Sequence, residues 1–134
     1  MQPIRLMGDG YEPHVDRLGD RLTYSLPVDS GVVSFSFTFD IDQVDLDVLL
    51  SDNYRRAVLY VIAHTLLQRS TSKGNVRFTQ NDFDTLVANT LHSPLERLQT
   101  FIAAVGREHN ISIAHYVKEV MSSVSHSRGN RGAS

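Results

Sequence analysis

The feature that most constrains the fold is a regular alternation of apolar and small polar side chains between residues 32 and 41. The apolar positions are Val33, Phe35, Phe37, Phe39 and Ile41, and the polar positions between them are Ser34, Ser36, Thr38 and Asp40. A period of two predicts a β-strand with one aromatic face and one polar face. Because a lone strand or hairpin is marginal in water, this face requires a covering layer.

The preceding residues supply a partner strand. Residues 21–27 place Leu22, Tyr24 and Leu26 on one side, and Pro27 is expected to close the strand. The turn residues Asp29-Ser30-Gly31 then predict an antiparallel β-hairpin. Residues 1–20 contain prolines and glycines without a sustained period, so we expect an irregular N-terminal arm.

Helical patterns follow the hairpin. Residues 42–50 predict a short helix, and residues 53–69 predict a long one that is capped by Ser51 or Asp52. The long helix is apolar around most of its circumference, which predicts a central buried helix that covers the phenylalanine face. Residues 76–78 could add a short edge strand.

Three further helices have recognisable N-terminal caps. Thr79 precedes Asp82 in a capping pattern, Ser93 precedes Pro94 at the first helical position, and Ser112 begins a helix that extends to residue 124. Residues 125–134 are rich in Ser, Gly and Arg and predict a disordered tail. The sequence therefore predicts one α+β domain over residues 21–124, in which a small antiparallel hairpin sheet packs on a bundle of about four helices.

The sequence contains few of the residue patterns that are typical of enzymes. The chain has no cysteine, so thiol nucleophiles, disulfides and cysteine-ligated metals are excluded. No nucleophile-elbow, phosphate-loop or dinucleotide-binding motif occurs, so we expect a non-enzyme without a cofactor. The six histidines lack the spacing of a helical zinc site, and we predict no metal, although the role of His109 and His115 stays open.

No stretch is long enough to span a membrane, and the N-terminus lacks the apolar core of a signal peptide. We therefore expect a soluble, cytoplasmic protein that does not bind membranes. The net charge is −2, but the charges are segregated along the chain. Residues 1–53 carry ten acids against three arginines, whereas residues 54–134 carry ten basic residues against five acids. Such segregation can produce an acidic surface that attracts a basic partner, unless the two halves neutralise each other in the fold.

The acids are densest where the hairpin meets the helices. This cluster consists of Asp40, Asp42, Asp45, Asp47 and Asp52. It fails the EF-hand pattern, because Val44 and Asp45 occupy the fifth and sixth loop positions. A solvated corner that complements helix dipoles is the simplest structural interpretation. As a functional hypothesis, the same five residues form an acidic partner-binding edge.

We therefore predict a small non-catalytic protein-binding module with a basic protein partner. One concrete version is an immunity-type protein that neutralises a basic toxin or nuclease. An alternative is a nucleic-acid-associated regulator that uses a helix-turn-helix-like hairpin at residues 80–107, through Arg97, Gln99 and Arg107. A third is a structural or oligomeric component that pairs through the hydroxyl-bearing strand, and the sequence leaves the oligomeric state open.

Overall fold

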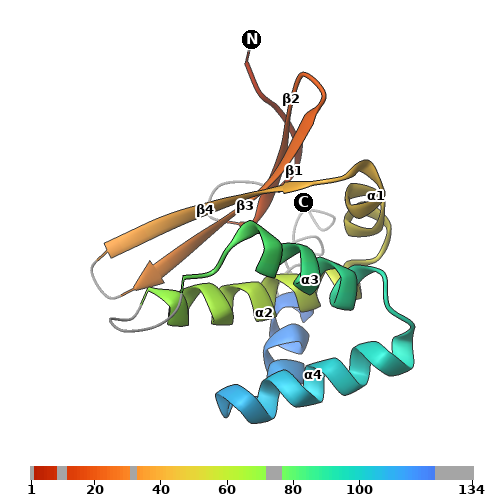
Figure 1. The fold of residues 1–134 in the computed structure, drawn as a ribbon. Helices are drawn as coiled ribbons and strands as arrows, with labels where there is room; N and C mark the ends of the chain where they lie inside the picture. Colours follow the sequence, from red (N-terminus) through yellow and green to blue (C-terminus); the bar gives the residue numbers. More distant parts are fainter. Residues whose placement is uncertain (1, 9–11, 31–32, 72–76, 123–134) are drawn as a thin grey trace, which may run out of the picture.

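The sheet is antiparallel and follows chain order. The computed structural model describes residues 2–8, 12–30, 33–71 and 77–122. Four strands lie side by side in the order β1 (Ile4–Met7), β2 (His14–Leu18), β3 (Arg21–Ser30) and β4 (Val33–Ile41), as Figure 1 shows. The predicted hairpin is formed by β3 and β4, which pair Tyr24 with Phe39 and Leu26 with Phe37.

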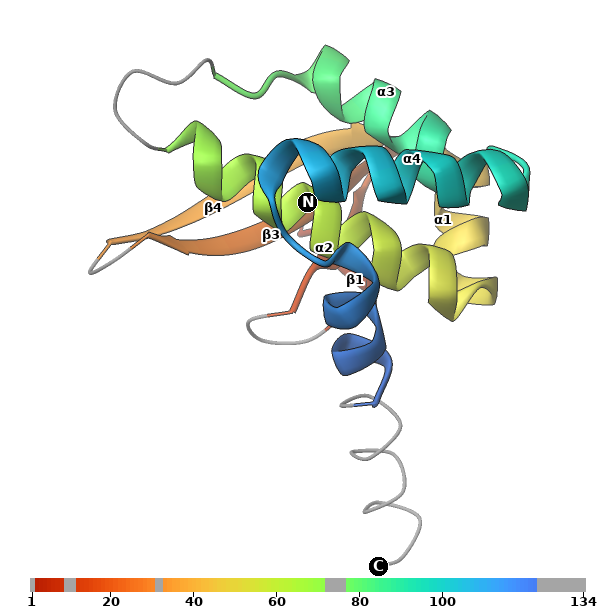
Figure 2. The ribbon, with the colours of Figure 1, turned by 90° about the horizontal axis from the view of Figure 1, so that it is seen from below.

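The helices form two layers beneath the sheet. The first layer contains α2 (Asn53–Ser70) and α3 (Gln80–Leu91), and α1 (Gln43–Ser51) lies at the end of β4. The second layer contains α4 (Leu95–His109) and a helical segment at 113–122, which Figure 2 shows from below. The predicted α+β class and single domain are confirmed. No helix in the described part of the chain has the length and apolar character needed to cross a bilayer.

The N-terminal segment differs from the expectation of an irregular arm. Residues 4–7 and 14–18 form β1 and β2, which widen the hairpin to four strands. Val15 on β2 is fully buried and pairs with Tyr24 on β3. Gly19 has a φ of +62° in the turn between β2 and β3, a conformation that favours glycine. The segment carries too few apolar residues for its alternation to be recognised alone.

Pro27 does not close β3, contrary to the prediction. The strand continues to Ser30, and Pro27 pairs with Ser36 on β4. The pairing of β2 with β3 ends at Ser25, so one edge of β3 is open at Pro27. A proline is tolerated there because no second neighbouring strand requires its missing N–H.

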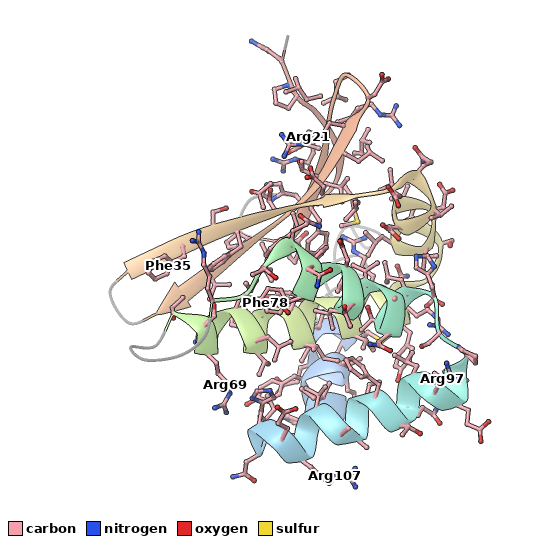
Figure 3. The ribbon with its side chains drawn as sticks, viewed as in Figure 1. Arg21, Phe35, Arg69, Phe78, Arg97 and Arg107 are labelled. Atoms are coloured by element: carbon pink, nitrogen blue, oxygen red, sulfur yellow. The ribbon has the colours of Figure 1, made fainter. Side chains whose placement is uncertain are left out.

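The core confirms α2 as the central buried helix but changes what covers the phenylalanine face. Buried side chains of α2 pack against β3, whereas α3 packs against β4. Phe83 of α3 stacks on Phe39 at 4.5 Å between ring centroids, and Phe78 meets Phe39 edge-on at 5.7 Å. Figure 3 shows Phe78 between the sheet and the helices. Residues 77 and 78 form no strand, so the predicted edge strand is wrong over its described residues.

The helix caps agree with the sequence except at α4. Asp52 accepts a hydrogen bond from the Arg55 N–H, and Thr79 and Asp82 form the predicted capping box. The Ser112 hydroxyl accepts from the His115 N–H at 3.3 Å. At α4 the N-cap is Pro94, because the Ser93 hydroxyl donates to the Asn89 carbonyl of α3 at 2.5 Å instead. The predicted tail at 125–134 lies outside the described residues.

Candidate protein-binding site

The structure gathers the five predicted acids around α1. Asp40 lies near the end of β4, Asp42 is the N-cap of α1, Asp45 and Asp47 lie within α1, and Asp52 joins α1 to α2. The five acids therefore lie near one another in the fold. Their contacts differ, however: some of the acids bond to other parts of the fold, and the others are available to a partner.

Asp45 is buried and has two structural contacts. One carboxylate oxygen accepts a hydrogen bond from the Asp42 N–H at 2.8 Å, which caps α1. The other lies 2.6 Å from Nε2 of His92, the residue that ends α3. This contact connects the start of α1 with the turn between α3 and α4. Asp45 therefore fixes the position of α1 and is not presented on the surface.

Asp52 and Asp40 also have local partners. The Asp52 carboxylate caps α2 and lies 3.4 Å from the Arg55 guanidinium, which also donates to the Thr90 carbonyl of α3 at 2.9 Å. Asp40 forms an exposed ion pair with Arg21 at 2.6 Å, and its hydrogen bond raises the pKa of Arg21. The negative charge of these two acids is therefore partly compensated.

The remaining acids lie on the solvent side of α1 beside two exposed aliphatic residues. We call Asp42, Val44, Asp47 and Leu50 the α1 face. Val44 is 61% exposed and Leu50 is 54% exposed. Asp47 is exposed, and its carboxylate accepts a hydrogen bond from the neutral Gln43 amide at 3.0 Å. Among the described cationic side chains, none lies within ion-pair distance of Asp42 or Asp47.

The sheet extends this surface. The Arg17 guanidinium on β2 donates to the Gln43 side-chain oxygen at 3.1 Å, which places the end of β2 beside α1. Ile4 pairs directly with Arg17 across the sheet and is 61% exposed. Because directly paired residues point to the same face of a sheet, Ile4 lies on the side of β1 that faces α1. Apolar side chains and unpaired acids are thus combined at this end of the molecule.

The helical pair proposed for nucleic-acid binding has the wrong charge. Arg97 and Arg107 lie on α4, and Figure 3 shows them far from Arg21 on the sheet. Glu96 and Glu108 offset these two cations on the same helix, and α3 carries two aspartates without any Lys or Arg. Residues 80–109 therefore have a formal charge of −2 with histidine neutral. A phosphate-binding surface needs a clear excess of cations.

The described histidines do not assemble a metal centre. In the described ranges, no three His, Cys, Asp or Glu residues are placed to share a metal ion. His115 lies 3.1 Å from Glu119 one turn further along its helix. The His109 carbonyl accepts a hydrogen bond from Arg69 at 2.8 Å. His109 and His115 therefore each have a separate structural contact, and the described contacts do not bring the two residues together in one site.

Two features of the site could not be predicted from sequence. The exposure of Val44 and Leu50 depends on how α1 is rotated, and the role of His92 depends on a contact between residues 47 positions apart. Comparison with known protein families, with curated proteins and with solved structures found no match to this chain. The function of the chain is therefore inferred from the geometry of the site.

Proposed function

We propose that this chain is a small non-catalytic protein-binding module that binds a basic protein through the α1 face. The observation that carries the proposal is the exposure of Val44 and Leu50 between two acids that have no cationic partner among the described side chains. Exposed aliphatic side chains become favourable when a partner covers them, and uncompensated carboxylates attract and orient a basic surface. Of the other three acids of the predicted edge, Asp45 and Asp52 cap helices at this corner, and Asp40 is paired with Arg21.

One concrete form of this function is neutralisation of a basic toxin or nuclease. Enzymes that act on nucleic acids have cationic substrate-binding surfaces, and an acidic aliphatic patch can cover such a surface. The excess of acids in residues 1–53 supports this version, because it steers a cationic partner towards the sheet and α1.

Edge-to-edge pairing of β4 is less favoured, for a local reason. The Gln80 side-chain amide accepts a hydrogen bond from the Asp40 N–H at 2.8 Å and donates to the Asp40 carbonyl at 3.0 Å. It thereby occupies the outer edge of β4 at this position, as a neighbouring strand would. Covering an edge in this way opposes the addition of another strand.

A capture experiment with matched charge variants tests the proposal. The tagged chain is used to capture partners from its native source at low and high salt, with bound protein identified by mass spectrometry and bound nucleic acid by absorbance. The test variant is Asp42→Asn with Asp47→Lys, because Asn preserves capping of α1. The control is Glu96→Gln with Glu108→Lys, which makes the same charge change on α4.

We expect the wild-type chain and the control variant to retain one near-stoichiometric basic protein that high salt releases. The test variant should lose about tenfold or more in affinity for it. Equal capture by both variants would contradict the α1 face as the site. Capture of nucleic acid that Arg97→Glu abolishes would replace the proposal with the regulator hypothesis.

A further inference from the structure

We propose that a groove between α2, α4 and the helix at 113–122 is a second docking site, which accepts an acidic amphipathic helix from a partner protein. This groove is separate from the α1 face, and none of the α1 face residues lines it. The chain would then have two binding surfaces of opposite charge.

The groove consists of two adjoining hollows. Their volumes are about 480 and 710 Å³, and both are lined by Tyr54, Ile102 and Ala114. Tyr54, in the first turn of α2, is half-buried and packs against the hydrophobic core. The shared residues make the two hollows one continuous depression. Figure 2 shows the ribbons of α4 and the 113–122 helix, whose residues line it.

The walls are stripes of two helices. The α4 wall uses residues at positions i, i+3, i+4, i+7 and i+8, and these are Gln99, Ile102, Ala103, Gly106 and Arg107. The second wall uses Ala114, Val117, Lys118 and Met121 with the same kind of spacing. Each stripe covers two turns, or about 12 Å at 1.5 Å per residue. A helix with apolar side chains at i, i+3 or i+4, and i+7 matches walls of this length.

Gly106 allows the backbone to pack closely at the end of the groove. Its carbonyl accepts a hydrogen bond from the Ile111 N–H at 3.0 Å, and a Cβ at this position would lie 2.8 Å from the Ile111 carbonyl oxygen. The chain can therefore turn tightly from α4 through Asn110, whose φ is +53°, into the next helix. The close turn brings the two walls together.

Charge selects the occupant. Among the described lining residues, Arg107 and Lys118 are the only charged ones, and no described acid lies within ion-pair distance of either. An apolar floor with two cations that form no ion pair among the described residues favours an aliphatic stripe flanked by Asp or Glu. Residues 125–134 of this chain are a poor match, because their charged residues are Arg128 and Arg131.

The α1 face of a second copy of the chain is the other acidic candidate for the groove, but the spacing of its exposed aliphatic residues fits the walls less well. The exposed aliphatic residues of the α1 face, Val44 and Leu50, are six positions apart, which differs from the three, four and seven of the walls. Self-association is therefore an outcome that the experiment must separate from peptide binding.

The test uses a designed fluorescent helical peptide of about 18 residues, with leucines at i, i+3 and i+7 and glutamates beside them. A matched peptide has lysine in place of every glutamate. Binding is followed by fluorescence anisotropy at low salt. Ala114→Phe fills the groove at an exposed helical position, and Ala104→Phe makes the same change at an exposed position of α4 outside the lining. Circular dichroism confirms that each variant is folded.

We expect the wild-type chain to prefer the acidic peptide, Ala104→Phe to bind it equally, and Ala114→Phe to lose about tenfold or more in affinity. Arg107→Glu with Lys118→Glu should reverse the preference towards the lysine peptide. Three results would overturn the proposal. These are no binding of the acidic peptide, equal effects of the two phenylalanine variants, and a wild-type mass in solution that doubles unless Ala114 is replaced by Phe.

Discussion

Two of the contacts that position the helices differ in their chemistry. The aromatic cluster, formed by Tyr24, Phe39, Phe78 and Phe83, joins the sheet to α3 through stacked and edge-on rings. The Asp45–His92 contact joins α1 to the end of α3 through a carboxylate and an imidazole 2.6 Å apart. The first removes a large apolar area from water, whereas the second satisfies polar groups in a fixed geometry.

This difference indicates a division of roles. Apolar burial is roughly proportional to area and has little directionality, so the aromatic cluster should contribute most of the stability at the sheet. A polar contact contributes less net free energy because water satisfies the same groups in the unfolded chain. The Asp45–His92 contact instead fixes where α1 lies, and this position determines which side of α1 is exposed.

The largest expected effect is at the centre of the aromatic cluster. Phe83 is fully buried and contacts both Tyr24 and Phe39. Phe83→Ala should lower the free energy of unfolding by about 3 to 5 kcal/mol, since it removes transfer energy and leaves a cavity. Urea denaturation measures this change. Phe35→Ala, at a side chain that is 39% exposed, should cost about 1 kcal/mol or less. Equal losses of unfolding free energy in the two variants would show that the aromatic cluster does not contribute most of the stability at the sheet.

A smaller effect is expected at the polar contact. Asp45→Ala removes the capping acceptor of α1 and the partner of His92, and we expect a loss of about 1 to 3 kcal/mol. Asp47→Ala, on the exposed side of the same helix, should change stability by about 0.5 kcal/mol or less. The two variants are compared by chemical denaturation at one pH. A larger loss at Asp47 would reverse the assignment of structural and available acids.

The aromatic cluster also predicts a decline in stability at alkaline pH. Burial raises the pKa of Tyr24 far above its ordinary value of 10.0, and the nearby Arg56 only partly opposes this shift. Above about pH 10 the unfolded chain loses the phenolic proton while the folded chain retains it. The folded state then binds more protons, so its stability falls as pH rises.

Tyr24→Phe should make this alkaline decline shallower, which denaturation at a series of pH values from about 8 to 11 would detect. The quantity to compare between the two proteins is how steeply the free energy of unfolding changes with pH, and not its value at any single pH. An unchanged slope would mean that Tyr24 ionises equally easily in both states, and that the ring is less buried than the structure shows.

The elements that depend on local patterns were predictable. Alternation identified the β3–β4 hairpin, and apolar density identified α2 as the central helix. The N-terminal strands were not predictable because β1 and β2 have weak alternation, and β2 becomes a strand by pairing Val15 with Tyr24. The start of α4 was misplaced by one residue, because Ser93 bonds to the preceding helix and not to its own.

The candidate site shows the same limit. The sequence placed five acids together but could not separate them, because their roles depend on tertiary partners such as His92 and Arg21. It also could not identify Val44 and Leu50 as exposed. The spacing of apolar residues reveals the exposed side of a helix only when that side is clearly polar. Because α1 has aliphatic residues on both sides, its sequence does not show which of them are exposed.

The most direct test of the central claim is amide hydrogen exchange of the chain alone and in complex with the basic protein that it captures. The α1 face should be the surface that becomes covered, so exchange over residues 43–51 and at the paired end of β1 and β2 should slow on binding. Exchange over α4 should stay unchanged. Protection of α4 or α3, with residues 43–51 unaffected, would contradict the assignment of the α1 face.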